Sequence, residues 1–278
     1  MAKSMDISDT LALMRQLSRA AASAILPHFR TGTTVDGKKT GYPGEGFDPV
    51  TEADRAGERA MRAILAEAAP HDAIIGEEYP ATAGTSGWTW YLDPVDGTRA
   101  FVAGLTNWTT LIGLADPSGN PVFGCIDQPA LGERYLGWPG GASLDTYGSG
   151  DSTDAATIPL QVSACRDLRD AVISTTDPFL FKPAEEGAWT HLRHTAKIVR
   201  YGLDAYAYAR LAAGTIDLVA ESELRPWDAA ALVPVVRGAG GLATDWRGKP
   251  ARTGPQLVCA VSQPVLDQTL LALRRSAD

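Results

Sequence analysis

Two carboxylates follow an apolar run in residues 90–98, which read WYLDPVDGT. Asp93 and Asp96 stand on either side of Pro94. The proline favours a turn at this point, which would let both carboxylates point into one space. The Val95 carbonyl would join them there as a further oxygen.

Further acidic residues stand at the ends of apolar runs or in the loop and helix before them: Asp48, Asp54, Glu77, Glu78 and Asp228. Like charges repel, so a cluster of these carboxylates would need bound cations. Oxygen ligands suit Mg²⁺ or Mn²⁺, whereas zinc prefers cysteine and histidine. If these segments converge, the sequence predicts a magnesium or manganese site.

The residues that follow Asp96 suit a phosphate ester. Gly97 allows close approach to the backbone, and Thr98 begins a predicted short helix whose first N–H groups would bind an anion. A metal, a helix start and a hydroxyl together are what a phosphate ester requires. Each signal alone has a plainer explanation, because a DPxD sequence is often a surface turn and Asp228 could simply cap a helix. Their combination is what predicts a metal-dependent phosphate site.

The composition argues against other classes of partner. The chain has 278 residues, 45% of them apolar, which suffices for a large core. The net charge is −8 and no Lys/Arg-rich run occurs, so we expect no nucleic-acid partner. No apolar run reaches about 18 residues, so we expect no membrane span, and no signal peptide is evident. The three cysteines form no CxxC motif, which indicates reduced thiols and a cytoplasmic protein.

The elements that must position these residues alternate along the chain. Apolar residues at helical spacing predict helices over residues 7–29, 51–68, 184–195, 204–213, 228–238 and 264–275. Short apolar runs predict strands over residues 73–76, 88–92, 111–115, 122–126, 171–174, 197–201, 216–220, 242–244 and 257–261. This mixture predicts a layered α/β or α+β fold.

Two Gly-rich segments interrupt the pattern. We expect residues 31–50 to form a long loop, either a mobile element of an active site or an ordinary surface excursion. We expect residues 139–157 to form a linker or surface loop between two halves, at about 1–145 and 155–278. The two halves are predicted to make a single unit over the whole chain.

Four segments resemble, in order and spacing, the motifs of the inositol monophosphatase family: DPVTEAD at 48–54, IGEE at 75–78, LDPVDGT at 92–98 and WDAA at 227–230. With the flanking helices, the resemblance covers nearly the whole chain. It implies a layered α-β-α-β-α sandwich and hydrolysis of small phosphate monoesters that depends on two or three Mg²⁺ ions. It also implies inhibition by Li⁺ and a homodimer.

The resemblance further implies roles for individual residues. The metal ligands would be Glu77, Asp93, the Val95 carbonyl, Asp96 and Asp228, with Asp48 on a looser third ion. Asp96, Gly97 and Thr98 would contact the phosphate. Glu77 and Thr98 would orient and deprotonate the attacking water, and Asp54 would accept a hydrogen bond from the Thr98 hydroxyl.

Within the family, further segments resemble the histidinol-phosphatase branch: residues 96–101, 124–129, 132–134, 202–208 and 221–228. Histidinol phosphate carries an ammonium and an imidazole, so its pocket should offer acids, and Asp204 and Glu221 are available. Asp228 and Arg99 would also contact this substrate. As plainer alternatives, Arg99 could pair with Asp127, and Asp204 could cap the helix that follows it.

We therefore expect a Mg²⁺-dependent histidinol-phosphate phosphatase of histidine biosynthesis. One alternative is hydrolysis of an inositol phosphate, a sugar phosphate or a 3′-phosphoadenosine nucleotide by the same machinery. Another is a non-catalytic phosphate-binding protein on the same scaffold. A binding protein has no need of Glu77 and Thr98 as a water-activating pair, which argues against this last alternative.

Overall fold

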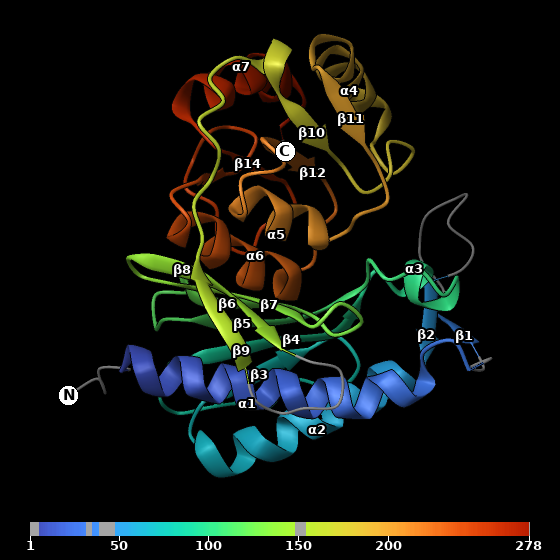
Figure 1. Ribbon diagram of the computed structural model, residues 1–278, viewed down its shortest axis with the longest axis vertical. Coiled ribbons are helices and arrows are strands. Elements are labelled where there is room, and N and C mark those ends of the chain that lie inside the picture. The colour runs from blue at the N-terminus through green and yellow to red at the C-terminus, as the bar shows by residue number, and fades with distance from the viewer. Residues whose placement is uncertain (1–5, 32–34, 39–47, 148–153, 278) are drawn as a thin grey trace.

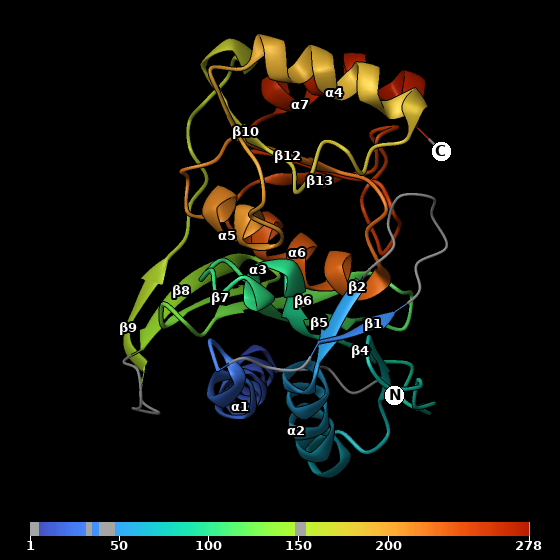
Figure 2. The ribbon, with the colours of Figure 1, turned by 90° about the vertical axis from the view of Figure 1, so that its right-hand side faces the viewer.

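The computed structural model describes residues 6–31, 35–38, 48–147 and 154–277 of the chain. Two sheets alternate with three layers of helices in these residues (Figure 1, Figure 2). The predicted α-β-α-β-α sandwich is therefore confirmed. Within the described residues no helix is long and apolar enough to cross a membrane, and the three cysteines are free thiols.

The larger sheet has seven strands in the order β3-β4-β5-β6-β7-β8-β9. Their bounds are Ala73–Gly76, Thr89–Asp96, Thr109–Ala115, Pro121–Gln128, Glu133–Trp138, Gly141–Tyr147 and Asp154–Pro159. β3 and β4 run parallel, and the later neighbours pair antiparallel. The helices α1 (Ile7–Ile25) and α2 (Glu52–Ala68) cover the outer face of this sheet (Figure 2).

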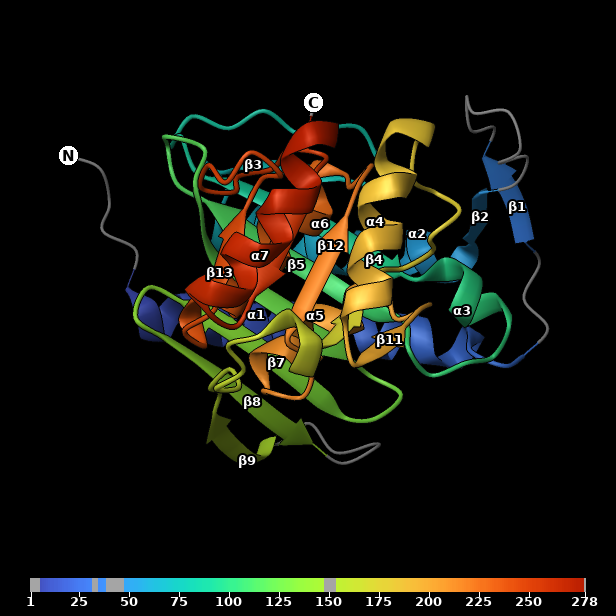
Figure 3. The ribbon, with the colours of Figure 1, turned by 90° about the horizontal axis from the view of Figure 1, so that it is seen from above.

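The smaller sheet has five strands in the order β11-β10-β12-β14-β13. In chain order, β10 to β14 span Val172–Ser174, Ile198–Arg200, Leu218–Glu221, Leu242–Thr244 and Leu257–Ala260. The helices α4 (Pro183–Thr195) and α7 (Gln263–Leu273) cover its outer face, as Figure 3 shows from above. The helices α5 (Tyr206–Ala212) and α6 (Pro226–Gly238) lie between the two sheets (Figure 2).

The start and the end of α1 follow local chemistry. The N-cap residue Asp6 accepts a hydrogen bond from the Asp9 N–H at 3.1 Å. The helix ends at Ile25, earlier than predicted, and continues as a single 3₁₀ turn, Leu26–His28. Pro27 lies in that turn, and a proline inside an α-helix would remove a hydrogen bond and clash with the preceding turn.

Helix α6 packs directly on the larger sheet because three glycines of the sheet have no side chain to keep it away. Gly113, Gly124 and Gly137 are register partners on β5, β6 and β7. A Cβ atom on Gly124 would lie 2.1 Å from the Ala231 carbonyl oxygen of α6, closer than atoms can approach. The stripe of glycines therefore sets the height of α6 above the sheet, and with it the place of Asp228 in the first turn of the helix.

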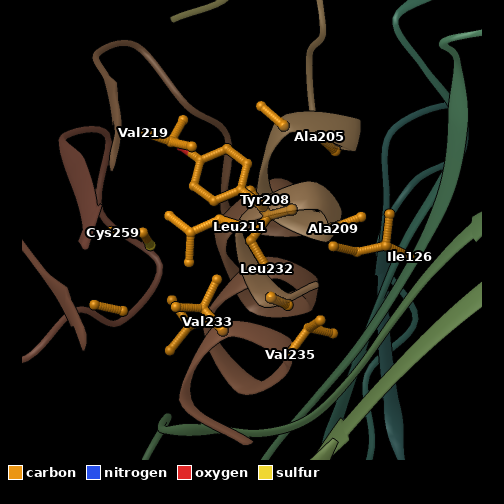
Figure 4. Packing of buried hydrophobic residues seen from close by; sticks show 14 of the residues in the cluster. Ile126, Ala205, Tyr208, Ala209, Leu211, Val219, Leu232, Val233, Val235 and Cys259 are labelled. Atoms are coloured by element: carbon orange, nitrogen blue, oxygen red, sulfur yellow. The ribbon is translucent and has the colours of Figure 1, made fainter. Parts of the chain in front are cut away.

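The core between the sheets draws on both halves of the chain (Figure 4). Its members include Ile126 from the larger sheet, Val219 and Cys259 from the smaller one, and residues of both central helices, among them Tyr208, Leu211, Leu232 and Val235. This shared core supports the predicted single unit, which itself stays a prediction.

The predicted linker over residues 139–157 is wrong. Strands β8 and β9 occupy much of it and extend the larger sheet. The polar composition of the segment hid the strands, because some of its polar side chains, such as Ser143 and Asp145, are buried. Asp145 of β8, for example, is fully buried and accepts hydrogen bonds from Arg15 at 2.7 Å and from Thr157 at 2.8 Å.

The long loop predicted over residues 31–50 is partly wrong. β1 (Val35–Lys38) and β2 (Asp48–Thr51) form a separate antiparallel pair within it. Residues 32–34 and 39–47 lie outside the described part of the chain. The two alternatives for this segment, a mobile element of an active site and an ordinary surface excursion, both stay predictions.

Candidate active site

A bulge in β4 brings two of the predicted carboxylates to one side of the sheet. Asp93 is the register partner of Leu111 on β5, and Asp96 is the partner of Thr109, so three steps on β4 match two on β5. In a regular strand, residues three positions apart point to opposite faces. The extra residue in the bulge reverses that relation, as the proline turn at Pro94 predicted.

Asp228 completes the cluster from the first turn of α6, the helix between the two sheets. One carboxylate oxygen from each of Asp93, Asp96 and Asp228 lies within 4.8 Å of the other two. These three residues line a cavity of about 230 Å³. The other predicted site residues that line it are Glu77, Val95, Gly97, Thr98, Arg99 and Asp204.

Negative charge on all three carboxylates at once is energetically unfavourable. Burial raises the pKa of Asp93 far above its ordinary value, and the charges of Glu77 and Asp96 raise it further. Burial also raises the pKa of Asp96, with Asp204 and Asp228 adding to the effect. The pKa of Asp228 rises to about 7, mainly through burial. Three neighbouring carboxylates whose negative charges are disfavoured in this way fit a divalent cation such as Mg²⁺ or Mn²⁺, which would neutralise them.

Backbone N–H groups orient each carboxylate of the cluster. The Val95 N–H donates to Asp93 Oδ1 at 3.0 Å, and the Ala205 N–H donates to Asp96 Oδ2 at 2.8 Å. The Arg225 N–H donates to Asp228 Oδ2 at 2.8 Å. Asp228 therefore caps the start of α6, as the plainer alternative predicted, and also faces the cluster.

Glu77 follows β3 and extends its pairing with β4. The Glu77 N–H donates to the Leu92 carbonyl at 3.1 Å, which places Glu77 beside the start of the DPVD turn. The next residue, Glu78, is held elsewhere, because its N–H donates to Glu58 Oε2 at 2.8 Å. Of the two adjacent glutamates, Glu77 is the one that lines the cavity.

Thr98 begins α3 (Thr98–Val102), which confirms the predicted short helix. Its hydroxyl donates to the Val95 carbonyl at 3.0 Å. Asp54 is buried and accepts hydrogen bonds from the N–H and the hydroxyl of Thr51 at 2.8 and 2.6 Å. Burial raises the pKa of Asp54 to about 6. A hydrogen bond from Thr98 to Asp54 stays a prediction, as does metal binding by Asp48, whose side chain lies outside the described part.

Asp204 lines the cavity and does not cap a helix. Helix α5 begins at Tyr206, and no side chain caps its start. Asp204 has φ 47°, in the left-handed region. Burial raises the pKa of Asp204 to about 6, although the nearby Arg99 charge opposes this. The capping alternative is therefore wrong, and the carboxylate is available to a bound molecule.

Glu221, the other acid predicted for the pocket, is engaged within the protein. Its Oε2 accepts from the Thr175 hydroxyl at 3.0 Å, and its Oε1 accepts from the Thr176 N–H and hydroxyl at 2.7 and 3.0 Å. Burial raises the pKa of Glu221 to about 8. Thr176 lines the cavity, so Glu221 supports the cavity wall. Direct contact of Glu221 with a substrate stays a prediction.

The predicted pairing of Arg99 with Asp127 is wrong. The register of β6 and β7 places Asp127 opposite Arg134, and the two buried side chains approach to 3.0 Å. Arg99 lies at the cavity, with its side chain 60% exposed and its Nη1 4.0 Å from Asp177 Oδ2. Arg99 is therefore placed to meet a bound molecule.

Four residues of the cavity wall were not predicted as site residues: Thr176, Leu180, Arg225 and Trp227. Arg225 and Trp227 stand beside Asp228 in the chain, so the motif around that acid was a usable signal. Thr176 and Leu180 lie in the segment after β10, which carries no motif. Their place in the wall follows from tertiary structure alone.

Known proteins resemble most of the chain. The model of the inositol monophosphatase family matches residues 6–278. The bifunctional phosphatase IMPL2, chloroplastic, of Arabidopsis thaliana is 38% identical over 251 residues, which cover 88% of this chain and 68% of that protein. The histidinol-phosphatase of Streptomyces coelicolor is 35% identical over 252 residues, 88% of this chain and 90% of that one. A solved inositol monophosphatase from Zymomonas mobilis is 34% identical with a TM-score of 0.81, over 98% of this chain and 100% of that one.

Proposed function

The chain belongs to the inositol monophosphatase family and is a phosphatase of that family, and on this premise we propose that it hydrolyses L-histidinol phosphate to L-histidinol and phosphate in histidine biosynthesis. The observation that carries the proposal is the Asp204 carboxylate in the wall of the cavity that holds the acidic cluster. The leaving group of histidinol phosphate carries an ammonium and an imidazole. A hydrogen bond from such a charged group to a carboxylate is worth about 1.5–3 kcal/mol.

Sequence identity alone does not separate the candidate substrates. The histidinol-phosphatase relative is 35% identical and the inositol monophosphatase structure is 34% identical. An inositol ring offers hydroxyl groups and asks for no extra negative charge. The acid at Asp204 therefore favours the cationic leaving group. Inositol phosphate, a sugar phosphate or a 3′-phosphoadenosine nucleotide remains the alternative substrate.

We propose that Mg²⁺ is the cofactor, with Mn²⁺ as a substitute and Li⁺ as an inhibitor. Glu77, Asp93, the Val95 carbonyl, Asp96 and Asp228 would hold two ions, and Asp48 would contribute to a third. When bound, such ions neutralise phosphate charge, make water more acidic and stabilise the departing alkoxide. The oxygen-only donor set and the raised pKa values of the cluster support this assignment.

The side chains of the cavity would then divide the work. Asp96, Gly97 and Thr98 would contact the phosphate, while Glu77 and Thr98 would orient the attacking water and accept its proton. No cysteine or serine nucleophile is needed for this displacement. Asp54 would support the Thr98 hydroxyl.

Substrate contacts beyond the phosphate would come from the rim of the cavity. Asp204 and Arg99 line it directly, and so does Asp228, which also belongs to the acidic cluster. Glu221 would contribute through the Thr176 wall or by direct contact. We further propose a cytoplasmic homodimer, which light scattering of the purified protein would test.

The test is phosphate release from histidinol phosphate, inositol 1-phosphate, a sugar phosphate and a 3′-phosphoadenosine nucleotide, each with Mg²⁺ and with EDTA. We expect Mg²⁺-dependent turnover with a clear preference for histidinol phosphate. A preference for another ester would overturn the substrate assignment while leaving the metal site intact. No Mg²⁺-dependent turnover of any of the four would contradict the assigned machinery.

A further inference from the structure

A glutamate of the larger sheet accepts hydrogen bonds from two tyrosine hydroxyls. Glu133 is the first residue of β7, and its Oε2 accepts hydrogen bonds from Tyr135 at 2.6 Å and from Tyr206 at 2.8 Å. Tyr135 lies on the same strand, whereas Tyr206 is the first residue of α5. The bond from Tyr206 to Glu133 therefore ties the sheet to the start of a helix between the two layers (Figure 2).

The residues just before Tyr206 carry the site. The Ala205 N–H donates to Asp96 Oδ2, and Asp204 lines the cavity. Asp204 has φ 47°, a backbone conformation that costs a non-glycine residue free energy and persists where its surroundings hold it. The backbone before α5 therefore needs a contact that holds it in this conformation. The hydrogen bond from Tyr206 to Glu133 supplies one at the residue directly after Asp204 and Ala205.

Further contacts hold Tyr135 and Tyr206 in place. Arg210 of α5 donates from Nη1 to the Tyr135 hydroxyl at 3.0 Å, so that hydroxyl donates to Glu133 and accepts from Arg210. The rings of Tyr135 and Tyr206 meet edge to face, with centroids 6.3 Å apart. Burial raises the pKa of both tyrosines, so both hydroxyls stay protonated and keep donating.

We propose that Glu133 is a positioning residue of this active site: through Tyr206 it fixes residues 204–206, which orient Asp96 and present Asp204 to the leaving group. Glu133 itself is not among the residues that line the cavity. It belongs to the segment Gly132-Glu133-Arg134, and no residue of that segment lines the cavity. The part that concerns Asp204 rests on the proposed substrate, whereas the part that concerns Asp96 does not.

The experiment uses three variants of the full chain. Tyr206→Phe removes one hydroxyl and keeps the ring, Glu133→Ala removes the acceptor, and Glu133→Gln keeps an acceptor oxygen. Calorimetric titration of metal-free protein with Mg²⁺, without substrate, is the first readout. We expect the dissociation constant to rise about fivefold in Tyr206→Phe and Glu133→Ala, as expected for one lost hydrogen bond, and to stay near wild type in Glu133→Gln.

The second readout is steady-state kinetics at saturating Mg²⁺. The KM for histidinol phosphate should rise in the same two variants, and it should rise more than the KM for glycerol 2-phosphate, whose leaving group is neutral and makes no use of Asp204. Tyr147→Phe is the matched control, because it also removes a hydroxyl bonded to a carboxylate, that of Asp127, but within the sheet.

Wild-type Mg²⁺ affinity in Tyr206→Phe, or an equal loss in Tyr147→Phe, would overturn the inference. The single-atom change in Tyr206→Phe keeps the test decisive if Glu133→Ala does not fold. If the wild-type protein does not hydrolyse histidinol phosphate, the proposed substrate fails, and the Mg²⁺ titration still decides the role of Glu133.

Discussion

The Asp204 carboxylate lies directly over Gly97: a Cβ atom on Gly97 would be 3.3 Å from Asp204 Oδ2. Gly97 has φ 79°, which favours glycine at this turn, so the space above it stays open to the carboxylate. The turn that would hold the phosphate and the acid that would bind the leaving group are thus neighbours in space. A fourth acid beside three clustered carboxylates is stabilised by positive charge, which Arg99 supplies in part and the proposed cationic substrate would supply further.

Replacing Asp204 with Asn should weaken the binding of histidinol phosphate specifically. The loss of one charged hydrogen bond predicts a KM at least about tenfold higher, with kcat at saturation changed much less. The KM for inositol 1-phosphate should not rise, because an amide serves a hydroxyl equally well. Steady-state kinetics with both esters measures the difference.

The matched control is Asp177→Asn, which removes a more exposed acid that also lies near Arg99. A surface charge of this kind should change the KM for either ester by less than about fivefold. Equal effects of the two substitutions on histidinol phosphate would refute the special role of Asp204.

Replacing Asp93 with Asn should abolish Mg²⁺-dependent turnover and yet stabilise the metal-free protein. Burial and the neighbouring acids disfavour a charge at Asp93, and the amide removes that charge. Thermal melting in EDTA should therefore give a higher midpoint for the variant than for the wild type. Added Mg²⁺ should raise the midpoint of the wild type much more than that of the variant. Wild-type turnover by the variant would contradict the metal assignment.

Glu221 should make the stability of the metal-free protein fall as pH rises. Its pKa is about 8 in the folded protein against an ordinary value of 4.5, so the folded state binds the proton more tightly. Its effect on stability is most favourable below about pH 4.5 and declines as pH rises towards 8. Each unit of pKa difference corresponds to about 1.4 kcal/mol.

Glu221→Gln isolates this effect, because the amide can keep the bonds to Thr175 and Thr176 without the charge. The melting midpoint of the variant relative to wild type should increase by several degrees between pH 5 and pH 8 in EDTA. If the melting midpoints of the two proteins changed with pH in parallel, the charge of Glu221 would not destabilise the folded protein.

The acidic cluster was predictable from sequence because its chemistry is local. Asp93 and Asp96 share one turn, and the bulge that joins them follows from Pro94. Asp228 entered through its own motif, and the fold then brought it within reach of the other two. Short motifs with strong conformational preferences carry this kind of information.

The pocket beyond the phosphate was less predictable because tertiary packing decides it. Asp204 and Glu221 looked equivalent in the sequence, yet the first lines the cavity and the second binds Thr175 and Thr176. The buried pair Asp127–Arg134 likewise depends on the register of two strands. A buried polar residue such as Asp145 also makes a strand resemble a loop in the sequence, which is why the predicted linker was wrong.

Gly124→Ala should destabilise the protein strongly and weaken metal binding with it. The new Cβ would lie 2.1 Å from the Ala231 carbonyl oxygen, so α6 must move away from the sheet. Overpacking of this kind costs about 1–3 kcal/mol or more. Since α6 carries Asp228, the Mg²⁺ dissociation constant should rise as the melting midpoint falls.

Gly187→Ala is the control, because Gly187 lies in α4 and a Cβ there meets nothing within 4 Å. Removing a glycine from a helix should stabilise the protein by about 0.5–1 kcal/mol and leave Mg²⁺ binding unchanged. Opposite shifts of the melting midpoint in the two variants would support the packing argument. A wild-type midpoint in Gly124→Ala would mean that the glycine stripe does not set the height of α6.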